Sequence, residues 1–169
     1  MGGSLGAQVL NENVPRALAL LDAASRPKVI HQAGTRHIDA LRASYRAANV
    51  EAELVPFITD IAKHYAEADL VICRAGALTV SELAAAGVAS VLVPYPHAVD
   101  DHQTSNARYL SDNKAAFLIP QAELTPQRLA DLLRQLTRRE LLRMAEAART
   151  FGKPDATSRV AHICMEAAQ

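Results

Sequence analysis

Short β-branched runs alternate with longer helical patterns over residues 1–120 of the sequence. The runs that read as strands cover 28–32, 50–57, 69–74, 90–94 and 115–119. The segments between them predict helices near 35–48, 59–67, 78–86 and 101–113. Strands separated by helices of this length imply right-handed crossovers and a parallel sheet covered on both faces. The pattern therefore predicts a doubly wound, Rossmann-like α/β fold.

The strand pattern stops after Pro120. The stretch "LTPQRLADLLRQL" places a proline at the start of an amphipathic helix with a stripe of leucines: Leu129, Leu132, Leu133 and Leu136. Two more helices are predicted near 138–150 and 155–168. We expect a single domain over 1–169, with a sheet core to about residue 120 and C-terminal helices over 121–169.

The opening "GGSLGA" (2–7) reads as a glycine-rich turn that leads into a helix, which we expect to break or restart at Pro15. In doubly wound folds such a turn follows the first, central strand. Only Met1 precedes it here. We therefore expect a fragment that lacks the first strand of its own domain.

Composition narrows the class of protein. Half of the 169 residues are apolar, which suffices for a core, and 18 basic residues balance 18 acidic ones. This balance gives no overall attraction to nucleic acid or anionic lipid. Cys73 and Cys164 lie in apolar surroundings without metal-ligand spacing, as is usual in a reducing compartment. With no apolar run near the roughly 20 residues of a membrane span and no signal peptide, we expect a cytoplasmic protein.

Three loops follow predicted strands or precede helices, where open α/β sheets bind ligands. In the first, Gly2, Gly3 and Gly6 let backbone amides approach an anion, and Ser4 adds a hydroxyl donor. The loop matches neither the dinucleotide fingerprint nor the P-loop. On its own it is equally well a helix cap.

The second loop lies within "CRAGALTVSELAAAG" (73–87). A turn at Gly76 would leave the N–H groups at the helix start free for an anion. Glu82, about one turn further, offers two acceptor oxygens to the paired hydroxyls of a ribose, or is simply an exposed acid. Arg74, at the strand end, could stack on a base or face a phosphate.

The third loop, "PYPHAVDDHQTSNA" (94–107), precedes a helix. His97, Asp100, Asp101 and His102 match no standard metal-site spacing, and the two aspartates fit better as caps of the helix. Gln103 and Asn106 are three residues apart and share a helix face, where both amides could meet sugar hydroxyls. A nucleotide-sugar is the ligand that uses all three loops.

The stretches "GGSLGA…N", "HQAG", "ADLVICRAGALTVSELAAAG" and "DDHQTSNA" resemble the C-terminal half of the MurG family, bacterial N-acetylglucosaminyltransferases of peptidoglycan synthesis. The resemblance covers essentially the whole chain. It implies a two-domain GT-B enzyme whose C-terminal half holds UDP-N-acetylglucosamine. The lipid-linked acceptor, lipid I, would bind mainly to an N-terminal domain absent here. That domain would also make the membrane contact, on the cytoplasmic face of the inner membrane.

The resemblance assigns a role to each matching position. Glu82 would hold the ribose, Gln103 the N-acetylglucosamine with help from Asn106, and Ile58 the uracil through its backbone, with Arg74 nearby. The diphosphate and sugar would contact two sets of residues: Gly3, Ser4, Leu5 and Gly6 in the first loop, and Ala77, Leu78 and Thr79 in the second.

The implied reaction is inverting transfer of N-acetylglucosamine to the 4-hydroxyl of lipid I, which gives lipid II and UDP. We expect no metal or other cofactor, because helix N-termini and Ser4 can stabilise the charge on the diphosphate. The general base is expected in the missing domain, so the chain alone should be inactive. Cell-wall synthesis, cell shape and cell division are the processes that such an enzyme serves.

Three alternatives fit parts of the pattern. A donor subunit of a two-subunit dolichol-pathway N-acetylglucosaminyltransferase should encode its own first strand. A UDP-sugar epimerase should show catalytic carboxylates and histidines in its cleft. A UDP-sugar-binding module without activity differs from the first reading only in turnover.

Overall fold

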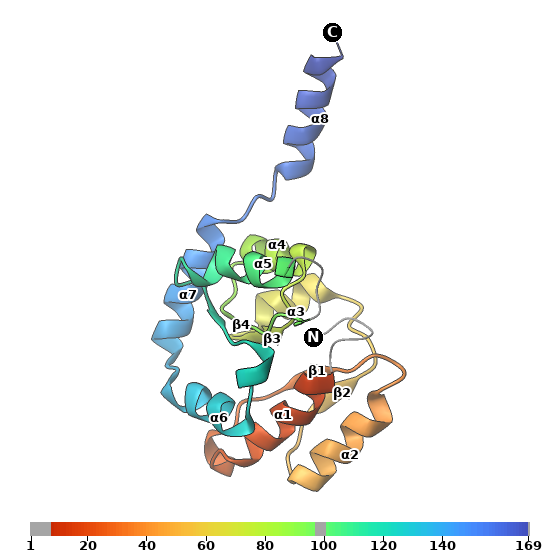
Figure 1. Ribbon diagram of the computed structural model, residues 1–169, viewed down its shortest axis with the longest axis vertical. Coiled ribbons are helices and arrows are strands. Elements are labelled where there is room, and N and C mark those ends of the chain that lie inside the picture. The colour runs from red at the N-terminus through yellow and green to blue at the C-terminus, as the bar shows by residue number, and fades with distance from the viewer. Residues whose placement is uncertain (1–7, 97–100, 169) are drawn as a thin grey trace.

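The computed structural model describes residues 8–96 and 101–168 (Figure 1), which alternate helices with short strands as expected. The strands are β1 (Ile30–Gln32), β2 (Glu53–Val55), β3 (Val71–Cys73), β4 (Ser90–Leu92) and β5 (Ala116–Leu118). The helices of the sheet region are α1 (Gln8–Ala19), α2 (Ile38–Ala48), α3 (Ile61–Glu67), α4 (Ala77–Ala86) and α5 (His102–Ser111). The remaining helices are α6 (Pro126–Gln135), α7 (Arg138–Thr150), α8 (Ala156–Ala167) and the 3₁₀ turns η1 (Ala23–Ser25) and η3 (Gln121–Glu123).

All strand pairs are parallel, which confirms the predicted α/β class. The strands nevertheless form two sheets, one of order β1-β2 and one of order β3-β4-β5. Among the described residues, β1 pairs only with β2 and β3 only with β4. Within residues 8–96 and 101–168, the strands therefore form two half-sheets.

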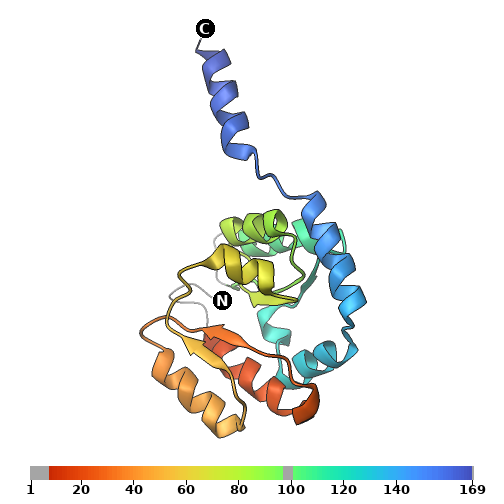
Figure 2. The same ribbon diagram turned by 180° about the vertical axis from the view of Figure 1, so that it is seen from behind.

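Strand β4 shows how the layers are organised, because its residues are buried on both faces. Val91 and Val93 belong to one apolar cluster, with side chains of α1, α2 and α6. Leu92 points to the opposite face and belongs to a second cluster, built mainly by α3, α4, α5 and their neighbours. We call these the α1 cluster and the α4 cluster. Figures 1 and 2 show the two helix layers on opposite sides of the strands.

Helix α1 lies between α2 and α6 and contacts both (Figure 1). It runs without interruption through Pro15, so the expected break there is wrong. A proline lacks the N–H that would bond the carbonyl one turn earlier and usually kinks a helix. Pro15 is fully buried here, and Leu10 and Leu18 anchor the helix in the α1 cluster on either side of it. Packing thus outweighs the local preference of proline.

The C-terminal helices begin at side-chain caps that the sequence encodes. Thr125 accepts a hydrogen bond from the N–H of Arg128 at the start of α6, with Pro126 in the first turn. Thr137 and Glu140 form a capping box on α7. Helix α8 instead projects away from the body of the molecule (Figures 1 and 2), and all of its described residues are exposed.

Candidate functional site

The described candidate residues follow the carboxyl ends of three strands. Ile58 comes after β2, Arg74 and the start of α4 after β3, and the segment leading to Gln103 after β4. Parallel strands direct these ends to one edge, so the fold brings the second and third loops to a common side. Gly2, Gly3, Ser4, Leu5, Gly6, His97 and Asp100 lie outside the described residues.

Helix α4 presents its N-terminus at this edge. The first backbone hydrogen bond of the helix runs from the N–H of Val80 to the carbonyl of Gly76. The N–H groups of Ala77, Leu78 and Thr79 therefore have no acceptor within the helix. Ala77 and Leu78 are exposed, and Leu78 retains 79% of its accessible surface. These N–H groups and the positive end of the helix dipole form a surface on which an anion can bind.

Gly76 precedes this helix, although neither its backbone conformation nor its neighbours in the chain require a glycine there. Its backbone angles, φ −63° and ψ 147°, are open to any residue. A Cβ added there would meet only the Thr79 hydroxyl oxygen, at 3.8 Å. The missing side chain therefore leaves open space next to the helix N-terminus, as close approach of a ligand requires.

Glu82 is exposed on α4, one and a half turns into the helix. The hydroxyl of Tyr65, on α3, donates a hydrogen bond of 3.3 Å to its Oε2. Tyr65 is 5% exposed, and burial followed by the charges of Cys73 and Glu82 raises the pKa of its phenol. The phenol thus keeps its proton as a donor. No local sequence pattern predicts this pair, because the two residues lie 17 positions apart.

Both terminal nitrogens of the Arg74 guanidinium donate hydrogen bonds to other groups of the chain. Nη1 donates to the carbonyls of Val93 and Pro94, and Nη2 donates to Oε1 of Gln121 at 2.6 Å. The guanidinium carbon also lies 5.4 Å from the ring centre of Tyr95. Arg74 is 8% exposed, and this burial lowers its pKa. In this structure the residue holds the segment after β4 and the turn η3 against β3.

Both predicted amides of α5 have partners within the chain. Oε1 of Gln103 accepts a hydrogen bond from the N–H of Tyr95, at 3.0 Å. Nδ2 of Asn106 donates to the carbonyl of Ala75, at 3.0 Å. Asn106 therefore ties α5 to the turn before α4, while Gln103 orients the segment after β4 and keeps its amide nitrogen as a donor group.

Asp101 occupies the position before α5, but it does not cap the helix as predicted. Its backbone is left-handed, with φ 51°, and its side chain makes no hydrogen bond to a backbone N–H of the helix. Oδ1 accepts instead from the hydroxyl of Thr104, at 2.6 Å. The capping expectation for this residue is wrong because the left-handed backbone leads the carboxylate to a neighbouring side chain.

A second polar cluster lies buried in the α1 cluster, away from solvent. His31, on β1, contacts the Tyr45 hydroxyl through Nδ1 at 2.9 Å and Asn11 Oδ1 through Nε2 at 3.0 Å. Burial lowers the pKa of His31 to about 3. A neutral imidazole with one N–H therefore joins β1, α1 and α2.

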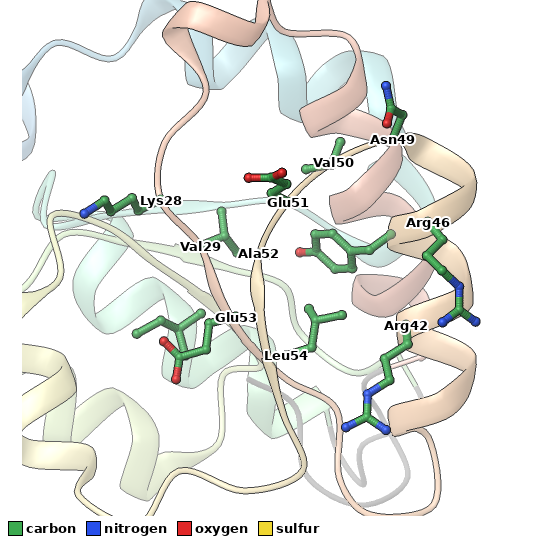
Figure 3. Close-up of a pocket in the computed structure, with 12 residues that line it drawn as sticks. Lys28, Val29, Arg42, Arg46, Asn49, Val50, Glu51, Ala52, Glu53 and Leu54 are labelled. Carbon is green, nitrogen blue, oxygen red and sulfur yellow. The ribbon is translucent and has the colours of Figure 1, made fainter.

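A large open pocket of about 950 Å³ lies at the other end of β1 and β2, against α2 (Figure 3). Its lining mixes the apolar side chains of Val29, Val50 and Leu54 with charges of both signs. Figure 3 shows Arg42 and Arg46 on α2, set apart from Glu53 across the strands. The charges do not converge on one point, and the pocket is separate from the edge that carries Glu82.

No group of three or more metal-binding side chains occurs within residues 8–96 and 101–168. Over the same residues, none of the helices has the length and apolar character to cross a membrane.

Parallel strands with helices between them, and a helix N-terminus at the carboxyl ends of the strands, place the domain in the Rossmann-like α/β class. The family model "Glycosyltransferase family 28 C-terminal domain" matches residues 1–160. The chain belongs to this family.

Its relatives narrow the class further. The chain is 61% identical to the UDP-N-acetylglucosamine--N-acetylmuramyl-(pentapeptide) pyrophosphoryl-undecaprenol N-acetylglucosamine transferase of Dechloromonas aromatica and 62% identical to that of Azoarcus sp.. Each match includes 100% of this chain and 48% of the relative. The chain thus spans about half the length of the curated relatives that it matches.

Solved structures agree with this assignment. The crystal structure of Acinetobacter baumannii MurG is 47% identical, with a TM-score of 0.90 over 98% of this chain and 50% of that one. The glycosyltransferase VinC, solved in complex with dTDP, is 18% identical, with a TM-score of 0.63 over 93% of this chain and 38% of that one. The second likeness shows the fold alone. The resemblance to MurG expected from the sequence is confirmed.

Proposed function

We propose that this chain is the donor-binding half of an enzyme that transfers N-acetylglucosamine from UDP-N-acetylglucosamine to lipid I. The observation that carries the proposal is the edge formed by β3 and α4. There, helix α4 carries both an open N-terminus and the carboxylate of Glu82. The N-terminus suits the phosphates of a nucleoside diphosphate, and the carboxylate suits its ribose hydroxyls. The names of the relatives supply the sugar and the acceptor.

Each residue of the edge has a defined part in this proposal. The main-chain N–H groups of Ala77, Leu78 and Thr79 bind the diphosphate, and Gly76 leaves room for it. The carboxylate of Glu82 accepts from the ribose hydroxyls. Ile58 meets the uracil through its backbone. The first-loop residues Gly3, Ser4, Leu5 and Gly6 are proposed to complete the phosphate site.

On α5, Gln103 binds the sugar through its side-chain amide nitrogen, because its Oε1 already accepts a hydrogen bond from the N–H of Tyr95. Arg74 and Asn106 support the site without touching the ligand. Arg74 donates to the carbonyls of Val93 and Pro94 and to the side-chain oxygen of Gln121, and Asn106 donates to the carbonyl of Ala75. This assignment differs from the expectation that both residues contact the donor.

The transfer step would develop negative charge on the departing UDP. Backbone N–H groups at a helix N-terminus stabilise such charge without reorganising. The base that takes the proton of the acceptor hydroxyl, the lipid I site and the contact with the cytoplasmic face of the membrane are proposed to belong to the other half of the protein. Through lipid II, the whole enzyme would serve peptidoglycan synthesis, cell shape and cell division.

Calorimetric titration with UDP-N-acetylglucosamine, without added metal, tests the proposal. We expect saturable binding to the unmodified chain. Glu82→Ala should weaken it at least about tenfold, because the ribose hydroxyls lose a charged acceptor. Glu51→Ala is the matched control: it removes an exposed carboxylate in the pocket at the other end of the strands, so affinity should not change.

Two results would contradict the proposal. One is a chain that is folded by circular dichroism and does not bind the nucleotide-sugar. The other is a loss of affinity in Glu51→Ala that equals or exceeds the loss in Glu82→Ala, because this would place the ligand in the pocket of Figure 3. Binding without turnover in the presence of lipid I is the expected behaviour of this half alone.

A further inference from the structure

We propose that Tyr65 is a positioning residue that holds the Glu82 carboxylate in the orientation that accepts the ribose hydroxyls. The inference rests on the proposed function and adds a residue that belongs to a different helix from Glu82. Its basis is the hydrogen bond of 3.3 Å from the Tyr65 hydroxyl to Glu82 Oε2.

The two partners differ sharply in their surroundings. Tyr65 is buried in the α4 cluster with Cys73, Val80 and Leu83, so its ring has a fixed place. Glu82 is exposed. An exposed glutamate samples several rotamers, and ordering such a side chain on binding lowers affinity. A hydroxyl fixed by a buried ring restricts the carboxylate before the ligand arrives.

The position of Tyr65 is itself well determined. Asp60 caps the start of helix α3: its side chain accepts from the N–H of Lys63 at 3.1 Å. The ring of His64 adds a contact of 2.7 Å between Nδ1 and the Asp60 carbonyl oxygen. These contacts fix the first turn of α3, and Tyr65 follows directly. The hydroxyl therefore comes from a rigid element and not from a loop.

The bond leaves the carboxylate able to bind a ribose. A carboxylate has two oxygens with about four acceptor sites. The Tyr65 hydroxyl uses one site, on Oε2, so Oε1 and the second site of Oε2 stay available for two ribose hydroxyls. Because burial raises the pKa of Tyr65, its hydroxyl keeps the proton that it donates to Oε2.

The test compares two probes, UDP and 2′,3′-dideoxy-UDP, by calorimetry on the full chain. Tyr65→Phe keeps the ring and removes only the hydroxyl. We expect it to weaken UDP binding roughly three- to tenfold and to leave the affinity for 2′,3′-dideoxy-UDP unchanged, because this ligand has no ribose hydroxyls. In a Glu82→Gln background the same substitution should weaken UDP binding much less.

Tyr109→Phe is the matched control. Its hydroxyl donates to the carbonyl of Phe151, at 3.2 Å, on the surface between α5 and the end of α7. Removing that hydroxyl should leave the affinity for both probes unchanged.

The remaining outcomes overturn the inference. An equal loss for both probes would show a general structural effect, and an unchanged affinity for UDP would show that the bond does not matter. Unfolding of Tyr65→Phe would show that the hydroxyl supports the fold itself. If UDP binds and Glu82→Ala weakens it while Tyr65→Phe does not, the proposed function stands without this inference. If UDP does not bind the folded chain, both are overturned.

Discussion

The two buried tyrosines of the α1 and α4 clusters have nearly the same exposure and opposite uses. Tyr45 is 2% exposed and Tyr65 is 5% exposed. The Tyr45 hydroxyl meets the buried ring of His31, whereas the Tyr65 hydroxyl reaches an exposed carboxylate. The first polar contact is closed to solvent and joins elements of the core. The second links the core to the proposed donor-binding edge, so burial alone does not distinguish a structural tyrosine from one that we propose to support a site.

The largest effect on stability should come from lowering the pH, which acts on the buried hydrogen-bond network of His31, Tyr45 and Asn11. Because the pKa of His31 is lowered to about 3 in the folded chain, the unfolded chain alone takes up a proton as the pH falls below about 6.5. The contribution of His31 is therefore fully present above pH 6.5 and is lost between 6.5 and 3. We expect about 1.4 kcal/mol less stability per pH unit in the middle of this range.

Urea unfolding at several pH values measures this slope. In His31→Gln, which carries no titrating ring, the slope between pH 6 and 4 should be smaller by roughly one proton. His37→Gln, on a partly exposed histidine next to α2, is the control and should keep the slope. An identical slope in His31→Gln would show that the ring is accessible and that the network is not closed.

A smaller loss is expected from Arg74, which holds the segment after β4. Arg74→Met keeps an apolar stem but removes the donor to the carbonyls of Val93 and Pro94. We expect a decrease of about 2 kcal/mol in the free energy of unfolding, because buried carbonyls lose a charged donor. Arg108→Met, at an exposed position of α5, should change it by less than about 0.5 kcal/mol. Equal changes in the free energy of unfolding for the two variants would contradict the role of Arg74 in holding the segment after β4.

The smallest effect on stability is expected at Gly76, where the effect on binding should be clear. Gly76→Ala should change the free energy of unfolding by less than about 0.5 kcal/mol, because a Cβ there meets no close atom. It should weaken UDP-N-acetylglucosamine binding at least about tenfold, since the methyl group occupies the proposed approach to α4.

Gly87→Ala should show the reverse pattern and serves as the control. Gly87 ends α4 with φ 69°, and a Cβ there would lie 3.1 Å from Cβ of Arg149. This substitution should cost about 1 kcal/mol or more in stability and leave the affinity of the folded chain unchanged. Thermal unfolding and calorimetry on both variants separate the two effects. Unchanged affinity in Gly76→Ala would contradict the proposed approach of the diphosphate.

Elements with a strong local pattern could be predicted from the sequence. The parallel α/β order and the helix beginning at Pro126 follow from periodicity and capping. The continuation of α1 through Pro15 could not, because packing from distant residues overrides the local preference. The division into two half-sheets also needs the positions of all five strands.

The candidate edge shows the same limit. The residue types of Gly76 and Glu82 pointed to an anion and a ribose before their places were known. The partner of Glu82 is on another helix, and the guanidinium of Arg74 bonds groups 19, 20 and 47 positions away. Sequence patterns within one element do not encode such contacts. They therefore predict a candidate binding helix, but not the residues on other elements that hydrogen-bond to its side chains.

The outer strands β2 and β5 also bear on how the chain behaves in concentrated solution. Among the described residues, β2 pairs only with β1 and β5 only with β4, so each of these two strands has a strand neighbour on one side only. Such edges are templates for a strand of any chain that can reach them. Solubility of this protein should therefore depend on what covers those two edges more than on its net charge, which is zero.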